Sequence, residues 1–151
     1  MPSHSRYVRH RRQCHGGGIM VWLMILPNGI LSFHFIKGKF KSADYIALLD
    51  KFVIPIIKLN LKPGFHFQQD NCSVHKAHIV QNYMKNNNMS TMKWPSLSPD
   101  LNIVEDVWKI ISDLVYDGPQ FLNAADLQKK IVDVIQIINS TRRHVISDLY
   151  A

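Results

Sequence analysis

The chain has 151 residues, a mass of 17.5 kDa and a formal net charge of +7. A hydrophobic content of 46% favours a packed globule over a disordered chain, and the length suffices for one domain with its own core. The longest continuous apolar stretch, residues 19–26, is far shorter than the roughly 20 residues that cross a bilayer. The positive charge favours a polyanionic partner but does not identify it.

Two cysteines, Cys14 and Cys72, cannot supply a four-cysteine zinc site or a disulfide scaffold. They indicate reduced thiols in a cytosolic or nuclear protein. Residues 1–15 form a basic arm that contains Arg9, Arg11 and Arg12 and has no apolar run typical of a signal peptide. We expect residues 16–151 to form one α/β domain.

The first regular structure should be a β-hairpin. Residues 19–26 and 30–35 are apolar and flank the turn sequence Pro-Asn-Gly at 27–29. Because the first of these segments lacks alternation, both of its faces should be covered.

A helix, a strand and a second helix should follow. Ser42 is the expected N-cap of the first helix, and Pro55 should bend or restart that helix near Ile54. Residues 65–69 are expected to form a strand that ends at Asp70, and a helix is expected over 76–85. The run of three asparagines at 86–88 ends that helix.

Residues 91–94 can form one more strand before a polar, proline-rich loop. Two helices complete the chain, the second of them capped by Asn123. Their expected buried faces share apolar side chains at helical spacing. These are Val104, Val107, Trp108, Ile111, Leu114 and Val115 in the first, and Leu127, Ile131, Val134, Ile135 and Ile138 in the second.

Two acids are the candidate site. Asp70 follows an expected strand, Glu105 lies in the first turn of an expected helix, and 34 residues separate them. Acids at a strand end and on a following helix can converge on a divalent metal pair. Taken singly, each has an ordinary structural explanation, because Asp is common in turns and Glu is favoured in a first helical turn.

The surrounding sequence resembles the Tc1-like branch of the Tc1/mariner transposases. The matching segments are residues 15–22 (His-Gly-Gly-Gly-Ile-Met-Val-Trp), 67–71 (Phe-Gln-Gln-Asp-Asn, with His75) and 94–102 (Trp-Pro-Ser-Leu-Ser-Pro-Asp-Leu-Asn), followed by Glu105 and Trp108. Three separated segments occur in the right order, and the resemblance covers roughly residues 15 to 140.

The resemblance implies an RNase H-like fold, in which a mixed sheet is flanked by helices, and DNA cutting and joining at an Asp-Asp-Glu metal site. Asp70 matches the second acid and Glu105 the third, with Mg²⁺ or Mn²⁺ as cofactor. Double-stranded DNA, both transposon ends and target, is the implied partner. Asn71 and His75 lie in the active-site segment and are candidate DNA contacts, together with the arginines of the basic arm. The resemblance also implies a nuclear location and a possible homo-oligomer, with no membrane partner.

One feature of the family pattern has no counterpart. The first Asp of the family lies on a strand before the Gly-Gly-Gly segment, and residues 1–15 contain no Asp or Glu. We therefore expect a domain that lacks its first strand and is catalytically incomplete. The alternative is a non-catalytic basic protein that binds DNA phosphates through the arm and through Lys37, Lys39 and Lys41.

Overall fold

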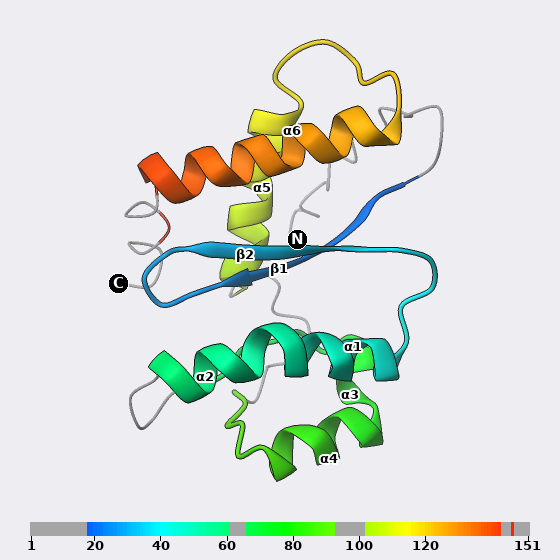
Figure 1. Ribbon diagram of the computed structural model, residues 1–151, viewed down its shortest axis with the longest axis vertical. Helices are drawn as coiled ribbons and strands as arrows, with labels where there is room; N and C mark the ends of the chain where they lie inside the picture. Colours follow the sequence, from blue (N-terminus) through cyan, green and yellow to red (C-terminus); the bar gives the residue numbers. More distant parts are fainter. Residues whose placement is uncertain (1–17, 61–65, 93–101, 143–145, 147–151) are drawn as a thin grey trace, which may run out of the picture. The chain divides into compact units, whose positions relative to one another are not determined.

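The computed structural model of the protein describes residues 18–60, 66–92, 102–142 and 146 (Figure 1). Contacts within the chain group into two compact units. The hairpin unit comprises the described residues up to Phe35 and from Asp106 onward, and the helical unit comprises those from Ile36 to Glu105. The elements in chain order are β1 (Met20–Ile25), β2 (Leu31–Ile36), α1 (Ser42–Leu48), η1 (Leu49–Val53), α2 (Ile54–Asn60), α3 (Ser73–Lys76), α4 (His78–Asn86), α5 (Ile103–Val115), α6 (Ala124–Ile137) and η3 (Ile138–Arg142).

Strands β1 and β2 form the expected hairpin. Within the described residues, the sheet consists of these two strands. Gly29 donates its N–H to the carbonyl of Leu26 at 2.8 Å and adopts a φ of +78°, a left-handed conformation that favours glycine. The Asn28 side chain accepts from the N–H of Ile30 at 3.1 Å. A turn followed by a left-handed glycine is a common three-residue hairpin loop.

The expectation that both faces of the first strand are covered is confirmed at its centre. Leu23 and Met24 are adjacent and therefore point to opposite faces, and both are buried. Trp22 is partly buried, whereas Met20 at the strand's start is half exposed.

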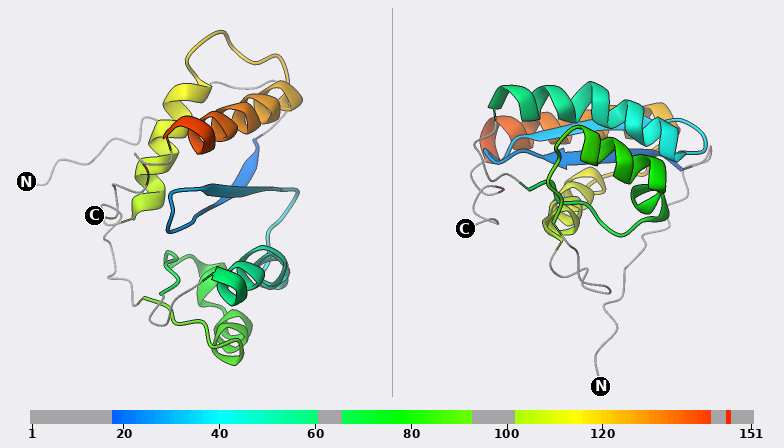
Figure 2. Two further views of the ribbon diagram at one scale, coloured as in Figure 1. Left: turned by 60° about the vertical axis from the view of Figure 1, so that its left-hand side comes forward. Right: turned by 90° about the horizontal axis from the view of Figure 1, so that it is seen from below.

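In the hairpin unit, α6 lies across α5 (Figures 1 and 2). The expected apolar faces of both helices are confirmed, although three members of the first are only partly buried. The predicted cap is also confirmed, because the Asn123 side chain accepts the N–H of Asp126 at 2.9 Å. Buried side chains in these helices and in η3 are Val107, Ile111, Val115, Leu127, Ile131, Val134, Ile135 and Ile138.

The side chain of Asn139 in η3 takes the place of a neighbouring strand at the start of β2. Its Oδ1 accepts the N–H of Leu31 at 2.8 Å, and its Nδ2 donates to the carbonyl of Leu31 at 3.0 Å. Leu31 is only 3% exposed, so both backbone groups would otherwise be buried without partners. This amide therefore ties η3 to the hairpin.

In the helical unit, α1, η1 and α2 follow one another as a single rod (Figure 1). The prediction that Ser42 is the N-cap is wrong by one residue. Lys41 is the N-cap, and its backbone N–H donates to the carboxylate of Asp44 at 2.8 Å. That acceptor, rather than the Ser42 hydroxyl, fixes where the helix begins.

The predicted disturbance at Pro55 is confirmed and takes the form of a π-helical segment. η1 comes immediately before the helix that contains Pro55, and the N–H of Ile54 donates to the carbonyl of Leu49, five residues back. Proline has no N–H to donate and crowds the preceding turn, so a wider turn accommodates it without ending the rod.

The helix predicted over 76–85 is confirmed as α4, and a short helix that was not predicted, α3, precedes it. They separate at Ala77, whose backbone is extended (φ −57°, ψ 137°). The Gln81 side chain donates to the carbonyl of His75 at 2.7 Å, which gives a carbonyl at the end of α3 a donor and allows the break. The predicted end of the second helix, at the asparagines, is correct, and Asn88 there has a positive φ of 53°.

The strand predicted over 65–69 is wrong within the described residues. It is a single parallel bridge between Phe67 and Thr91, in which Phe67 donates to the carbonyl of Ser90 at 2.7 Å. One extended neighbour, residues 90–92, yields one bridge rather than a ladder. Residue 65 and the second half of the strand predicted over 91–94 lie outside the described residues.

Among the helices of the described residues, none has the length and apolar character needed to span a membrane.

Candidate functional site

Asp70 stands where the chain leaves the core of the helical unit. Phe67 is buried and paired with residues 90–92, and the chain reaches the surface three residues later, where Asp70 is exposed. The Oδ1 of Asp70 accepts the N–H of Cys72 at 3.0 Å. This local hydrogen bond closes a tight turn after the bridge and orients the carboxylate.

His75 is the direct partner of Asp70. Its Nδ1 lies 2.7 Å from the Oδ1 of Asp70 and 3.3 Å from the backbone carbonyl oxygen of the same residue. Both of these oxygens are acceptors, so the two contacts are hydrogen bonds in the tautomer that carries its hydrogen on Nδ1. The side chain of Asp70 is 54% exposed and that of His75 only 17%. Contacts from Cys72 and His75 use Oδ1, which leaves Oδ2 as the oxygen available to a further ligand.

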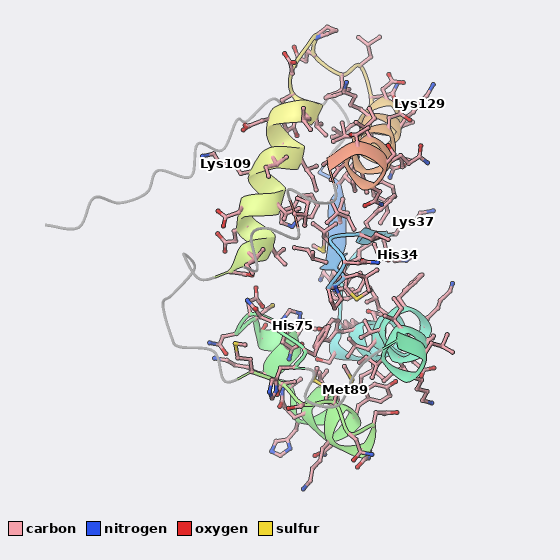
Figure 3. All side chains as sticks on the ribbon, turned by 90° about the vertical axis from the view of Figure 1, so that its left-hand side faces the viewer. His34, Lys37, His75, Met89, Lys109 and Lys129 are labelled. Atoms are coloured by element: carbon pink, nitrogen blue, oxygen red, sulfur yellow. The ribbon has the colours of Figure 1, made fainter. Side chains whose placement is uncertain are left out.

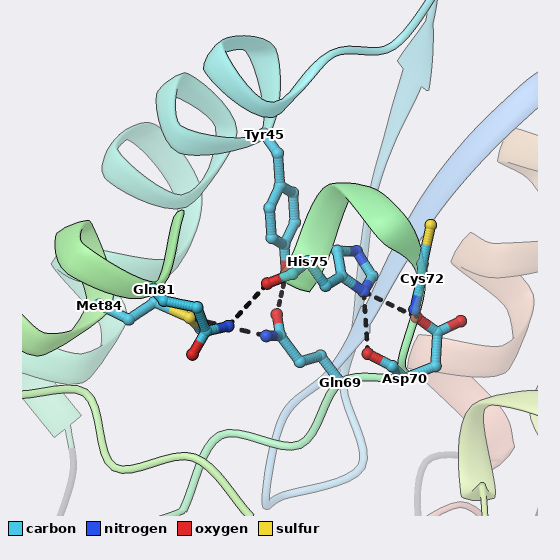
Figure 4. A network of polar contacts seen from close by, with 7 residues as sticks. All are labelled: Tyr45, Gln69, Asp70, Cys72, His75, Gln81 and Met84. Carbon is cyan, nitrogen blue, oxygen red and sulfur yellow. Dashed lines mark hydrogen bonds and ion pairs between the residues drawn. The ribbon is translucent and has the colours of Figure 1, made fainter. Parts of the chain in front are cut away.

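Buried groups fix the position of this pair (Figure 4). The ring of Tyr45 packs against the imidazole of His75 with centroids 4.4 Å apart. The Tyr45 hydroxyl donates to the Oε1 of Gln69 at 2.6 Å, and the Nε2 of Gln69 points to the sulfur of Met84 at 3.6 Å. The chain on either side of Asp70 is thereby attached to α1 and α4.

Tyr45 stays protonated over the ordinary pH range. Burial raises the pKa of the Tyr45 phenol well above its usual value, and the negative charge of Asp70 raises it further. The hydroxyl is thus a permanent donor to Gln69. This makes the contact structural rather than acid–base in character.

Glu105 belongs to a different element, α5. It lies in the first turn of α5, its side chain is partly buried, and its N–H donates to the carbonyl of Asn102 at 2.8 Å. The structure therefore brings together Asp70 and His75 of the predicted residues, and convergence of Glu105 on Asp70 stays a prediction. Asn71 is exposed beside Asp70. Arg9, Arg11 and Arg12 lie outside the described residues.

The Asp70 carboxylate is the type of ligand that a hard divalent cation prefers. Asp70 offers one carboxylate oxygen to solvent, and Mg²⁺ and Mn²⁺ prefer such oxygen ligands. Within residues 18–60, 66–92 and 102–142, no three His, Cys, Asp or Glu side chains group closely enough to hold a metal ion. Asp70 fits one ligand position and needs a second acid to complete it.

Tyr45, Gln69 and Gln81 support the site, and we did not predict them. One signal was available, since a tyrosine on the buried face of α1 needs a partner for its hydroxyl. Gln69 and Gln81 carry no such signal, because their partners depend on the break between α3 and α4.

Comparison with known proteins identifies the family to which this chain is similar. Residues 3–128 match the model of a family described as DDE superfamily endonuclease. The chain is 32% identical over 124 residues to the transposable element Tc3 transposase of Caenorhabditis elegans, which covers 82% of this chain and 38% of that protein. It is 34% identical over 113 residues to the Tcb1 transposase of Caenorhabditis briggsae, covering 72% of this chain and 41% of that protein. The chain thus spans about two fifths of these relatives.

A solved structure shares the fold. The Mos1 transposase catalytic domain, determined with raltegravir and Mg, superposes with a TM-score of 0.58 at 14% identity. The match covers 87% of this chain and 74% of that one. The predicted RNase H-like α/β fold is confirmed by this likeness.

Proposed function

The chain belongs to the DDE superfamily of endonucleases, in its Tc1-like transposase branch, and on this premise we propose that Asp70 and Glu105 hold a divalent cation for DNA cleavage and strand transfer. The main support for the proposal is the exposure and orientation of the Asp70 carboxylate. Its carboxylate is exposed at the end of a bridged segment, and two donors fix Oδ1 while Oδ2 stays available. Glu105 supplies the second acid from the first turn of α5.

Each part of the site has a separate task. Asp70 and Glu105 would supply carboxylate oxygens, and the buried groups around Tyr45 would keep the first of them oriented. When bound, the divalent ion supplies charge that activates the attacking hydroxyl and stabilises the leaving oxygen of a phosphodiester. Exposed lysines would offset the negative charge of the DNA backbone.

Binding of Mn²⁺ to the purified chain, followed by electron paramagnetic resonance, tests this assignment. We expect Asp70→Asn and Glu105→Gln each to weaken binding at least tenfold, because each removes a charged ligand. Asp113→Asn is the matched control, since Asp113 is an exposed acid on the same helix as Glu105. Equal affinity in Asp70→Asn and Asp113→Asn would refute the site.

We also propose that these 151 residues do not cut DNA by themselves. The sequence contains no Asp or Glu before Asp44, so no acid precedes the hairpin as the family pattern requires. A labelled DNA duplex incubated with the chain and Mn²⁺ should stay intact. Cleavage that disappears in Asp70→Ala would contradict this second proposal without affecting the first.

A second candidate function is non-catalytic DNA binding, which one observation favours. Lys37, Lys39 and Lys41 are all exposed within five residues, and no described acid lies within ion-pair distance of their ammonium groups. Lys37 directly follows the end of β2 and is labelled in Figure 3. Such a cluster can bind the phosphate oxygens of DNA without recognising the base sequence.

The salt dependence of duplex binding tests whether Lys37, Lys39 and Lys41 contact the DNA phosphates. Binding of a duplex to the chain should weaken steeply between 50 and 200 mM salt, and replacing all three lysines by alanine should lower the slope. Replacing Lys109 and Lys129, which are also exposed, is the control. A slope that is the same in both variants would dismiss the cluster. Action on DNA would also place the protein in the nucleus, which a fluorescent fusion can test.

A further inference from the structure

We propose that His75 is a positioning residue for Asp70: by donating Nδ1–H to Oδ1 it orients the carboxylate so that Oδ2 is presented to the divalent cation. The inference rests on the proposed function, because it assumes that Asp70 is a metal ligand. It deepens that function by assigning a task to a side chain that would not itself touch the metal.

The first argument is the geometry around one oxygen. Oδ1 of Asp70 receives two donors, Nδ1 of His75 at 2.7 Å and the N–H of Cys72 at 3.0 Å. An exposed aspartate with one donor can still rotate about its Cβ–Cγ bond. Two donors on the same oxygen select one orientation and direct the other oxygen outward (Figure 4).

The second argument is that His75 is itself held in place. The Tyr45 ring packs against its imidazole at 4.4 Å, and the side chain of Gln81 donates to its backbone carbonyl at 2.7 Å. Its side chain is 17% exposed, whereas that of Asp70 is 54% exposed. A largely buried, packed donor facing an exposed acid is the arrangement that supports metal ligands in general.

A simpler explanation assigns His75 only to the stability of α3. That helix has four residues, and an ion pair at its end would help it form. The two explanations differ in what a conservative change does. A stabilising role predicts changes in unfolding alone, whereas positioning predicts changes in metal affinity in a protein that is still folded.

The test is the Mn²⁺ affinity of the full chain, measured by electron paramagnetic resonance at fixed pH. His75→Phe keeps the ring against Tyr45 and removes the donor, and we expect about a 10- to 100-fold loss of affinity. His75→Asn places an amide N–H near the position of Nδ1 and should stay within about threefold of the unchanged protein. His78→Phe is the control, because His78 is exposed and two residues beyond α3.

The results distinguish the positioning role of His75 from the proposal that Asp70 is a metal ligand. If Asp70→Asn abolishes Mn²⁺ binding and His75→Phe leaves it unchanged, only the positioning role is overturned. If Asp70→Asn itself has no effect, both proposals fail. Should His75→Phe unfold the chain, ¹⁵N resonances of the unsubstituted protein decide: the proposal requires a protonated Nδ1, and an imidazole protonated only at Nε2 overturns it.

Discussion

The hydroxyl of Tyr45 should be a measurable tie between α1 and the segment that leads to Asp70. Tyr45 is 1% exposed, and its hydroxyl donates to Gln69 at 2.6 Å, one residue before the candidate metal ligand. Tyr45→Phe removes this donor and keeps the ring that packs against His75. The substitution therefore isolates one hydrogen bond from the packing around it.

The expected magnitude follows from what each partner loses. An intramolecular hydrogen bond contributes about 0.5–1.5 kcal/mol net, and an acceptor left buried without a donor adds to the loss. Gln69 is only partly buried, so water can reach its freed oxygen. We therefore expect Tyr45→Phe to lower the free energy of unfolding by about 0.5–1.5 kcal/mol.

Urea unfolding of a double-mutant cycle measures the contact directly. Gln69→Leu alone should also destabilise the protein, because it leaves the buried Tyr45 hydroxyl without an acceptor. The double variant should lose less than the sum, with a coupling of about 1 kcal/mol. Tyr83→Phe is the matched control, since the Tyr83 hydroxyl donates to exposed Asp50 at 2.8 Å and its loss should stay within about 0.5 kcal/mol.

Two results would refute this reasoning. The first is that Tyr45→Phe lowers the free energy of unfolding no more than Tyr83→Phe does. The second is that the double-mutant cycle shows no coupling energy between Tyr45 and Gln69. Either result would mean that the hydroxyl does not attach the Asp70 segment to α1.

Three further predictions concern stability and use urea unfolding. Because the pKa of Tyr45 is raised, the unfolded chain loses its proton first, so the free energy of unfolding should fall by roughly 1.4 kcal/mol per pH unit above about pH 10, and Tyr45→Phe should remove that contribution. A pH dependence unchanged by the substitution would contradict it. Asn139→Ala should cost about 2–4 kcal/mol, because both backbone groups of buried Leu31 lose their partner; a cost like that of exposed Gln136→Ala would disprove the tie. Asn123→Ala should cost about 1 kcal/mol and Asn123→Gly only a few tenths, and equal costs would argue against the cap.

The parts of the fold that were predictable from sequence are those set by local residues. The Pro-Asn-Gly turn fixes the hairpin, and Asn123 fixes the start of α6, because each acts on backbone groups a few residues away. Pro55 likewise acts on its own preceding turn. Such features require no knowledge of distant contacts.

The errors occur where distant or competing contacts decide. The expected strand before Asp70 pairs with residues 90–92 at a single bridge, and strand formation depends on such neighbours rather than on propensity. The break at Ala77 depends on which carbonyl the Gln81 side chain meets. Ser42 offers a capping hydroxyl, but the carboxylate of Asp44 defines the helix start one residue earlier.

The candidate site divides in the same way. Asp70 was proposed because it ends a recognisable segment and Glu105 because of its spacing from Asp70, and their role as metal ligands stays a prediction. The contact between Asp70 and His75 could not be predicted, since the conformation of the four residues between them was unknown. Tyr45 lies still farther away along the chain and reaches the site only through the packing of α1 beside α3.

Line broadening by Mn²⁺ in an amide NMR spectrum tests the central claim, that Asp70 and Glu105 share one divalent ion. At substoichiometric Mn²⁺ we predict that the amide signals of residues 70–72 and of Glu105 broaden together, because the ion relaxes nuclei near it. Asp70→Asn should abolish the broadening at Glu105, and Glu105→Gln the broadening at 70–72. Broadening confined to one of the two segments, or surviving the substitution of the opposite acid, would contradict a shared metal site.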